Sequence, residues 1–302
     1  MTKTLPRNTL IGISLAVLAT FIWSWNFIVA RGIYKQIPPV SLAFWRWLTA
    51  TLILLPLAWK SFVKDWPVIR KSLLYFFVAG LTGVTMFNTF VYIGAQYTTA
   101  INLALIGTTT SPVISVFFAR VFLKEKIGWL KLTGMLICII GILFLLSKGD
   151  FRNLLSFRFT KGDLWVLAAA LAFAVYNTMV KRKPITVSPM SFLFTAFVIG
   201  TILLLPFYFQ ETSNTPPIQW TWKLILIILY LGLGASVICF LIWNIAIGKL
   251  GAGRAALFGN LIPVFSTMEA VLILNEDFTS VHIVSILLVF AGILLANLKF
   301  GR

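Results

Sequence analysis

Polar side chains that could bind a ligand lie inside long apolar runs of this sequence. Trp25 and Asn26 stand in FIWSWNFIVAR, and Tyr176 and Asn177 stand in AFAVYNTMVKR, 151 positions later. A side-chain amide is costly in an apolar environment unless it finds a hydrogen-bond partner. The repeated amides and their aromatic neighbours are therefore expected either to bind a substrate or to join helices to one another.

Two charged residues inside apolar runs suggest ion chemistry. Arg46 lies in WRW, and it is expected either to hold an anion or a carboxylate at the mouth of a pocket or to extend its charged group to a membrane surface. Glu269 is expected either to take up a coupling proton or cation or to pair with an arginine near the surface. Further candidates for the lining of a pocket are Asn88, Tyr92, Trp243 and Asn260.

Long apolar segments must position these residues. The chain of 302 residues is 60% hydrophobic and 11% charged, whereas a soluble protein has about 25% charged residues. A bilayer core of about 30 Å is crossed by roughly 20 helical residues. The sequence predicts an all-α polytopic membrane protein with ten transmembrane helices, over about 10–30, 40–59, 72–94, 98–123, 127–147, 163–181, 188–209, 222–246, 251–274 and 279–299.

The net charge of +17 follows from membrane topology and does not indicate a nucleic-acid partner. With ten helices and a cytoplasmic N-terminus, most lysines and arginines fall on the cytoplasmic side, as the positive-inside rule requires. We therefore expect a multi-pass protein of the inner (cytoplasmic) membrane, surrounded by lipid bilayer, with both termini in the cytoplasm.

The two halves of the chain resemble each other. Residues 92–125 align without a gap onto residues 243–276, and the pairs Ala95/Ala246, Pro112/Pro263 and Glu125/Glu276 are identical at one offset. Five helices in each half is an odd number, so the second half must be inverted. Inverted repeats are typical of secondary transporters, whose substrate binds near the midplane between the halves. The predicted organisation is a first repeat over 1–147, a linker over 148–162 and a second repeat over 163–302, around a central cavity.

Pro112 and Pro263 lie midway along the fourth and ninth predicted helices. Each proline removes a backbone hydrogen bond and should kink its helix. The kinks predict two hinges beside a central pocket. The alternative is a pair of packing kinks, with neighbouring hydroxyl groups bonded back to their own helix.

The sequence contains no phosphate-binding loop, nucleophile elbow or zinc-spaced pair. Cys138 and Cys239 fall inside apolar segments and do not suggest a disulfide framework or a metal site. We therefore expect a protein that is not an enzyme and uses no cofactor or metal. The predicted fifth and tenth helices are poor in polar residues and are expected at the periphery, where they could form a homodimer.

The segments WSWNFIVAR and LAFWRW, with the paired SPVISVFFARVFLKE and IPVFSTMEAVLILNE, resemble the EamA-type transporters of the drug/metabolite transporter superfamily. The resemblance covers essentially the whole chain. It implies ten helices, cytoplasmic termini and a central cavity formed by helices other than the fifth and tenth. By the same resemblance, Asn26 and Arg46 match family positions, whereas Glu269 departs from a position where an apolar or small residue is commoner.

The resemblance also implies transport of a small-molecule substrate, with amino-acid export a frequent activity. We expect a secondary transporter that exports small metabolites by alternating access around a midplane pocket, with amino acids, aromatic ones included, as the first candidates. Two alternatives stay open on the sequence alone. One is a permease for nucleotide-linked sugars or drug-like solutes, and the other is a membrane receptor or scaffold without transport.

Overall fold

Every element of the described chain is helical. The structure is a computed structural model that describes residues 7–33, 35–97, 107, 110–111, 114–118, 120–122, 124, 128–147, 149–155, 161–266, 268 and 279–297. The α-helices are α1 (Arg7–Ile33), α2 (Pro39–Ile69), α3 (Leu73–Gly80), α4 (Phe87–Tyr97), α6 (Trp129–Leu146), α7 (Arg152–Leu155), α8 (Lys161–Arg182), α9 (Pro189–Ser213), α10 (Trp222–Leu229), α11 (Cys239–Leu250), α12 (Ala252–Leu257) and α14 (Ser280–Asn297). Between them lie the 3₁₀ segments η1 (Arg70–Ser72) and η4 (Phe258–Leu261) and the π-helical segments η2 (Leu81–Met86) and η3 (Tyr230–Ile238).

Five helical stretches of the described chain are long and apolar enough to cross a membrane: Arg7–Trp25, Pro39–Tyr97, Lys161–Arg182, Pro189–Ser213 and Trp222–Leu250. Two shorter helices, Trp129–Gly141 and Ser280–Ala296, are apolar as well. Large apolar side chains such as Leu74, Leu226 and Leu287 are exposed on the outside of the molecule. A surface of this kind suits contact with lipid rather than with water.

The helix α2 is longer than the sequence predicts. The helix expected over 40–59 continues to Ile69, where η1 and α3 follow without an extended connection. Lys60 and Lys64, which suggested a gap between helices, lie on the exposed side of α2, and Ala58 is buried on the other side. The charges therefore do not mark the end of this helix. In the predicted linker, α7 forms a short helix and α8 begins at Lys161.

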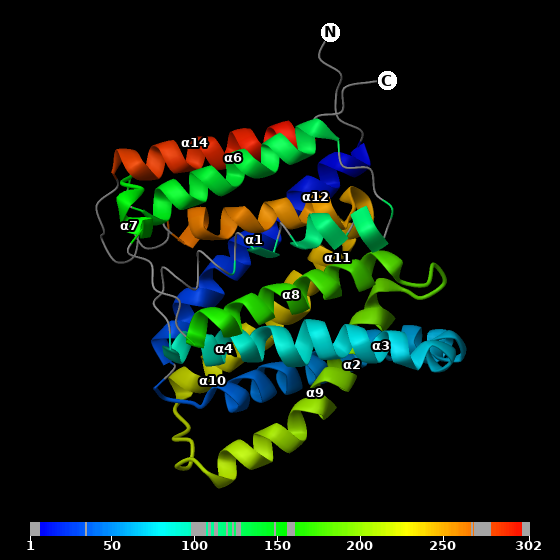
Figure 1. Cartoon of the computed structure of the whole chain (residues 1–302). Helices are drawn as coiled ribbons and strands as arrows, with labels where there is room; N and C mark the ends of the chain where they lie inside the picture. Colours follow the sequence, from blue (N-terminus) through cyan, green and yellow to red (C-terminus); the bar gives the residue numbers. More distant parts are fainter. Residues whose placement is uncertain are drawn as a thin grey trace.

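The helices pack in four main pairs: α6 with α14, α2 with α9, α1 with α11, and α4 with α8 (Figure 1). An offset of about 151 positions exchanges α1 with α8 and α4 with α11, so the last two pairs are counterparts. In the first two pairs, equivalent residues contact each other directly. The Oγ1 atoms of Thr51 and Thr201 lie 3.2 Å apart, and the Sγ of Cys138 lies 3.5 Å from the carbonyl oxygen of Val289.

The antiparallel helices α2 and α9 cap each other. The carboxylate of Glu211, near the end of α9, accepts hydrogen bonds from the backbone N–H groups of Val40 at 3.0 Å and Ser41 at 2.6 Å. The carboxylate of Asp65, near the end of α2, accepts one from the backbone N–H of Ser188 at 2.9 Å. The N–H groups of a first helical turn lack partners within the helix and favour a negative charge. The pair is therefore joined at both of its ends.

The π-helical segments η2 and η3 occupy equivalent positions in the two halves, and each contains a glycine, Gly83 or Gly234. A π-helical turn contains one extra residue and often marks a functional site. Gly83 faces the buried ring of Tyr176, which a methyl group at this position would overlap. The absence of a side chain at Gly83 thus allows η2 and α8 to pack closely.

We expect the substitution Gly83→Ala to destabilise the protein by about 1–3 kcal/mol, because the added methyl group must displace a ring that is fully buried. The measurement is the midpoint of thermal unfolding of the purified full chain in detergent. Gly248→Ala is the matched control, since a methyl group at Gly248 meets no heavy atom within 4 Å. Equal midpoints for the two variants would show that the contact between Gly83 and Tyr176 is unimportant.

Candidate functional site

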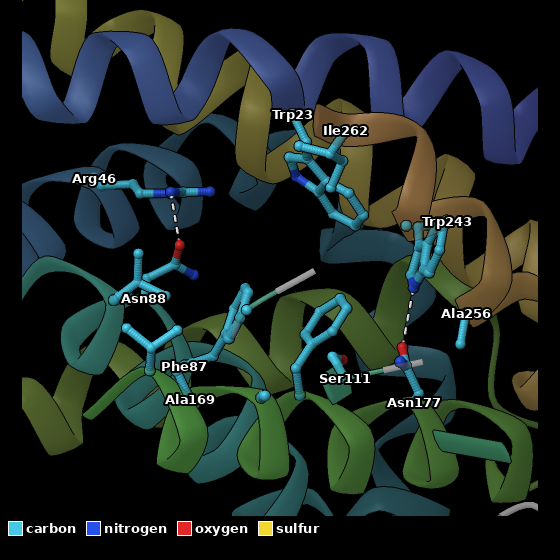
Figure 2. A pocket seen from close by; sticks show the side chains of 16 residues that line it. Trp23, Arg46, Phe87, Asn88, Ser111, Ala169, Asn177, Trp243, Ala256 and Ile262 are labelled. Atoms are coloured by element: carbon cyan, nitrogen blue, oxygen red, sulfur yellow. Dashed lines mark hydrogen bonds between the residues drawn. The ribbon is translucent and has the colours of Figure 1, made fainter. Parts of the chain in front are cut away.

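A cavity of about 70 Å³ lies between helices of both halves. Its lining comes from α1, α2, α4, α8, α11, α12, η4 and Ile262 just after it, together with Gly107 and Ser111. No lining residue among those described comes from α6 or α14, which pack together on one side of the molecule (Figure 1). The walls carry a buried cation, amides, a hydroxyl group and aromatic rings (Figure 2): Trp23, Arg46, Phe87, Asn88, Ser111, Phe173, Asn177 and Trp243.

Arg46 lies at one end of the cavity and is only 1% exposed. Its Nη1 donates to the Oδ1 of Asn88 at 2.8 Å and to the hydroxyl oxygen of Tyr92 at 2.7 Å, both on α4. Its Nε donates to the Oγ of Ser236 at 2.7 Å, and its Nη2 to the carbonyl oxygen of Ala235 at 3.1 Å, both in η3. The guanidinium therefore bridges an α-helix of the first half and the π-helical segment of the second.

The burial of Arg46 does not fit the prediction that its charged group reaches a membrane surface. A side chain that carried its charge to the membrane surface would expose its guanidinium, whereas this one is enclosed. A buried cation is stable only when it is well hydrogen-bonded, as it is here. The charge consequently contributes a positive potential at one end of the cavity.

Asn177 and Trp243 form the opposite end of the cavity (Figure 2). The indole N–H of Trp243 donates to the Oδ1 of Asn177 at 3.0 Å, and the Nδ2 of Asn177 donates to the Oγ of Ser115 at 3.2 Å. Ser111, one helical turn before Ser115, also lines the cavity. This end therefore offers amide and hydroxyl groups to a ligand, in contrast to the cationic end.

Aromatic rings connect the two ends. Trp23 packs edge-on against Trp243 and Phe173, with ring centroids 5.1 and 5.9 Å apart. Phe173 stacks on Phe87 at 4.4 Å. The indole N–H of Trp23 donates to the carbonyl oxygen of Ala235, which also accepts from Arg46. The aromatic wall is thus fixed to the same π-helical segment as the cation.

Four of the predicted substrate-binding residues line the cavity: Arg46, Asn88, Asn177 and Trp243. Four others lie elsewhere. Tyr92 contacts Arg46 and is outside the lining, and Tyr176 is fully buried and donates to the Oδ1 of Asn244 at 2.9 Å. Trp25 is half-buried on α1, and Asn260 is fully buried on η4; neither belongs to the lining.

Trp23 is a lining residue that the sequence reasoning missed. Residues two positions apart on a helix point to nearly opposite sides, so Trp23 and Trp25 cannot both face the cavity. The signal lies in small residues at helical spacing, because Ala16, Ala19 and Trp23 form one fully or almost fully buried stripe. A search for that stripe would have selected Trp23.

Several predicted residues lie outside the described part of the chain: Pro112, Glu125, Glu269 and Glu276, together with the side chain of Asn26. Pro263 is described and buried, and the 3₁₀ segment η4 ends two residues before it. A change from 3₁₀ to α-helical geometry near a proline fits a local bend. The hinge role of both prolines and the coupling role of Glu269 stay predictions.

The apolar helices and the cavity between them define a class: a polytopic helical membrane protein with a partly polar cavity among its helices. The family model of the EamA-like transporter family matches residues 10–147 and again residues 160–298. The chain therefore belongs to the EamA-like transporter family, and the two matches give it two copies of the family's unit. It is a multi-pass membrane transporter and not an enzyme. The prediction of a transporter and the prediction of a protein that is not an enzyme are therefore confirmed.

Curated relatives agree with this assignment. An uncharacterized transporter, YyaM of Bacillus subtilis (strain 168), is 27% identical over 90% of this chain and 88% of its own length. An uncharacterized transporter of Archaeoglobus fulgidus is 26% identical, over 94% and 96%. A probable terminal-alkyne amino-acid exporter of Streptantibioticus cattleyicolor is 27% identical, over 74% and 73%. A solved structure titled "Crystal structure of protein" has the same fold, with a TM-score of 0.76, 19% identity and 96% of each chain covered.

Proposed function

We propose that the protein exports small metabolites that carry a carboxylate, above all amino acids, by alternating access around the cavity. The observation that carries this proposal is the cavity itself, which has a buried cation at one end, amide and hydroxyl groups at the other, and aromatic walls between them. Such a site matches a small zwitterion with an apolar side chain. The relative that is described as a probable amino-acid exporter supports the same substrate class.

The proposal includes ten transmembrane helices in two inverted repeats, over 1–147 and 163–302. Two observations support this arrangement. Equivalent residues contact each other at Thr51 and Thr201 and at Cys138 and Val289, as expected near an axis that relates the two halves. The offset of about 151 positions that relates the two halves also converts the pair of α1 with α11 into the pair of α8 with α4. An axis of this kind lets one site open to either side in turn.

The direction of transport and its energy source are further parts of the proposal. The distribution of lysine and arginine supports cytoplasmic termini and a location in the inner membrane. We assign proton coupling to Glu269 and bending of the kinked helices to Pro112 and Pro263. The outer faces of α6 and α14 expose apolar residues such as Leu136 and Leu294, which could contact lipid or a second copy of the chain.

The size of the cavity favours small metabolites over nucleotide-linked sugars. A volume of about 70 Å³ corresponds to about six water molecules, at about 10–15 Å³ for each. A nucleotide-linked sugar is several times larger than an amino acid, and it would require a much greater expansion of the site. The amino-acid proposal requires less rearrangement.

The test is counterflow of labelled amino acids in proteoliposomes that contain the purified full chain, with empty liposomes as the control. We expect accumulation of at least one amino acid, reduced by unlabelled competitor and altered by a pH gradient. If correctly folded protein shows counterflow of no amino acid, this substrate class is rejected. Counterflow of nucleotide-linked sugars instead would support the alternative permease.

A further inference from the structure

We propose that Asn88 binds a carboxylate oxygen of the substrate directly through its amide N–H groups, and that Arg46 is the positioning residue that orients this amide. The inference rests on the proposed function, because it names the group of the substrate that the cationic end accepts. It assigns the direct contact to a neutral side chain and gives the charged side chain an indirect role.

The orientation of the Asn88 amide follows from the chemistry of its neighbour. A guanidinium group donates hydrogen bonds and accepts none, so the Asn88 atom at 2.8 Å from Nη1 of Arg46 must be the oxygen. This contact removes the usual ambiguity between the two ends of an asparagine amide. The Nδ2 of Asn88 is therefore turned away from the guanidinium (Figure 2).

The Nδ2 of Asn88 has no hydrogen-bond partner among the residues that the structure describes. Asn88 is only 2% exposed, and it belongs to the lining of the cavity. A buried donor without a partner costs about 1–3 kcal/mol, and at the wall of a cavity a ligand can supply the missing acceptor. The cavity side of this amide thus forms a donor site for a ligand.

The charge around this donor determines which ligand fits. Arg46 is the one charged residue among the described lining residues, and its guanidinium bonds to the same amide. A positive charge beside N–H donors favours an acceptor with negative charge, as in other charge-assisted hydrogen bonds. A ligand amine at this position would meet both a cation and two donors. The cationic end should therefore take the carboxylate, and the aromatic wall should take the side chain.

The contrast with Asn177 supports this assignment. Its Oδ1 accepts from Trp243 and its Nδ2 donates to Ser115, so both ends of that amide already have partners. Asn88 has a partner at its oxygen alone among the described residues. The two amides therefore have different tasks, although both were expected to line a pocket.

The experiment compares carboxylate ligands with their carboxamide analogues. Wild type and Asn88→Asp are purified as full chains, and their thermal stabilisation is titrated with amino acids and with the corresponding amino-acid amides, phenylalanine and phenylalaninamide among them. Asn88→Asp keeps the acceptor for Arg46 and replaces the N–H donors by a second oxygen. We expect wild type to prefer the acid, and Asn88→Asp to bind the acid at least tenfold more weakly while its affinity for the amide is retained or increased.

Asn244→Asp is the matched control. Asn244 is a second buried asparagine whose Oδ1 has a partner, from Tyr176, and whose Nδ2 has none, yet it lies outside the cavity lining. The same chemical change there should leave the preference between acid and amide unaltered. An equal change of preference in the two variants would overturn the proposal.

Arg46→Gln tests the positioning role. A glutamine amide can either donate or accept, so it no longer fixes the orientation of Asn88. We expect a higher KM for the acid in counterflow, a largely preserved maximal rate, and little change for the amide analogue. An unaltered preference between acid and amide in either Asn88→Asp or Arg46→Gln overturns the inference. If counterflow of amino acids persists in that case, the proposed function stands without it.

Discussion

The substitution Arg46→Met is expected to reduce the transport rate at low substrate concentration at least a hundredfold. Methionine has similar length and no donor, so it leaves the acceptors on Asn88 and in η3 without the cation that joins them. Each buried polar group that loses its partner costs about 1–3 kcal/mol, and a hundredfold loss corresponds to about 2.7 kcal/mol. The loss of the positive potential removes the attraction for a carboxylate as well.

The measurement is the initial rate of counterflow at a substrate concentration well below the KM of the wild type, normalised to the amount of reconstituted protein. Arg70→Met is the matched control, because Arg70 is exposed on η1. Wild-type rates for well-folded Arg46→Met would contradict the prediction. If that variant fails to fold, Arg46→Lys tests whether the guanidinium is needed for transport. Lysine keeps the charge but has a single donor centre, which cannot reach α4 and η3 together. We expect at least a tenfold loss for it, and full activity would show that the guanidinium geometry is unnecessary.

The substitution Asn177→Ala is expected to reduce transport by about tenfold to a hundredfold. It leaves the indole N–H of Trp243 without an acceptor and removes the amide at the far end of the cavity. A loss of about 1–3 kcal/mol at one polar contact corresponds to this range of rates. The rate of counterflow is the measurement, and Asn214→Ala, at an exposed position beyond α9, is the control.

A second variant separates two explanations of that loss. Trp243→Phe keeps an aromatic ring but removes the N–H that binds Asn177. If Asn177 acts by holding Trp243 in place, the two substitutions should reduce the rate equally. If Asn177 binds substrate, Trp243→Phe should retain much more activity than Asn177→Ala. Unaltered rates for both variants would show that this end of the cavity takes no part in transport.

The sequence predicted those parts of the site that depend on polarity. Arg46, Asn88 and Asn177 were identified because polar groups are costly inside apolar helices and rarely occur there without a role. The internal repeat predicted that residues from both halves would meet, as the lining does. These inferences need no knowledge of which way a side chain points.

Other parts of the candidate site were not predicted, because they depend on the direction of side chains and on backbone geometry. Tyr176 and Trp25 were expected in the pocket beside their asparagines, but neighbouring residues on a helix point about 100° apart. In helices that are apolar on all sides, hydropathy does not reveal which face is buried. The π-helical segments are also invisible to hydropathy, because they change the hydrogen-bond register and not the composition. Gly83 and Gly234 stand at equivalent positions of the two halves, but a glycine alone does not indicate such a change.

The reciprocal caps of α2 and α9 have a consequence for the moving parts of a transport cycle. Glu211 and Asp65 tie the two helices together at opposite ends, and Thr51 meets Thr201 between those ends. Because these contacts hold the pair at three levels, we expect it to move as one rigid unit. Its internal geometry should be the same whether the site faces inward or outward. In the proposed alternating-access cycle, we therefore expect the pairs of α1 with α11 and of α4 with α8 to tilt relative to this rigid pair.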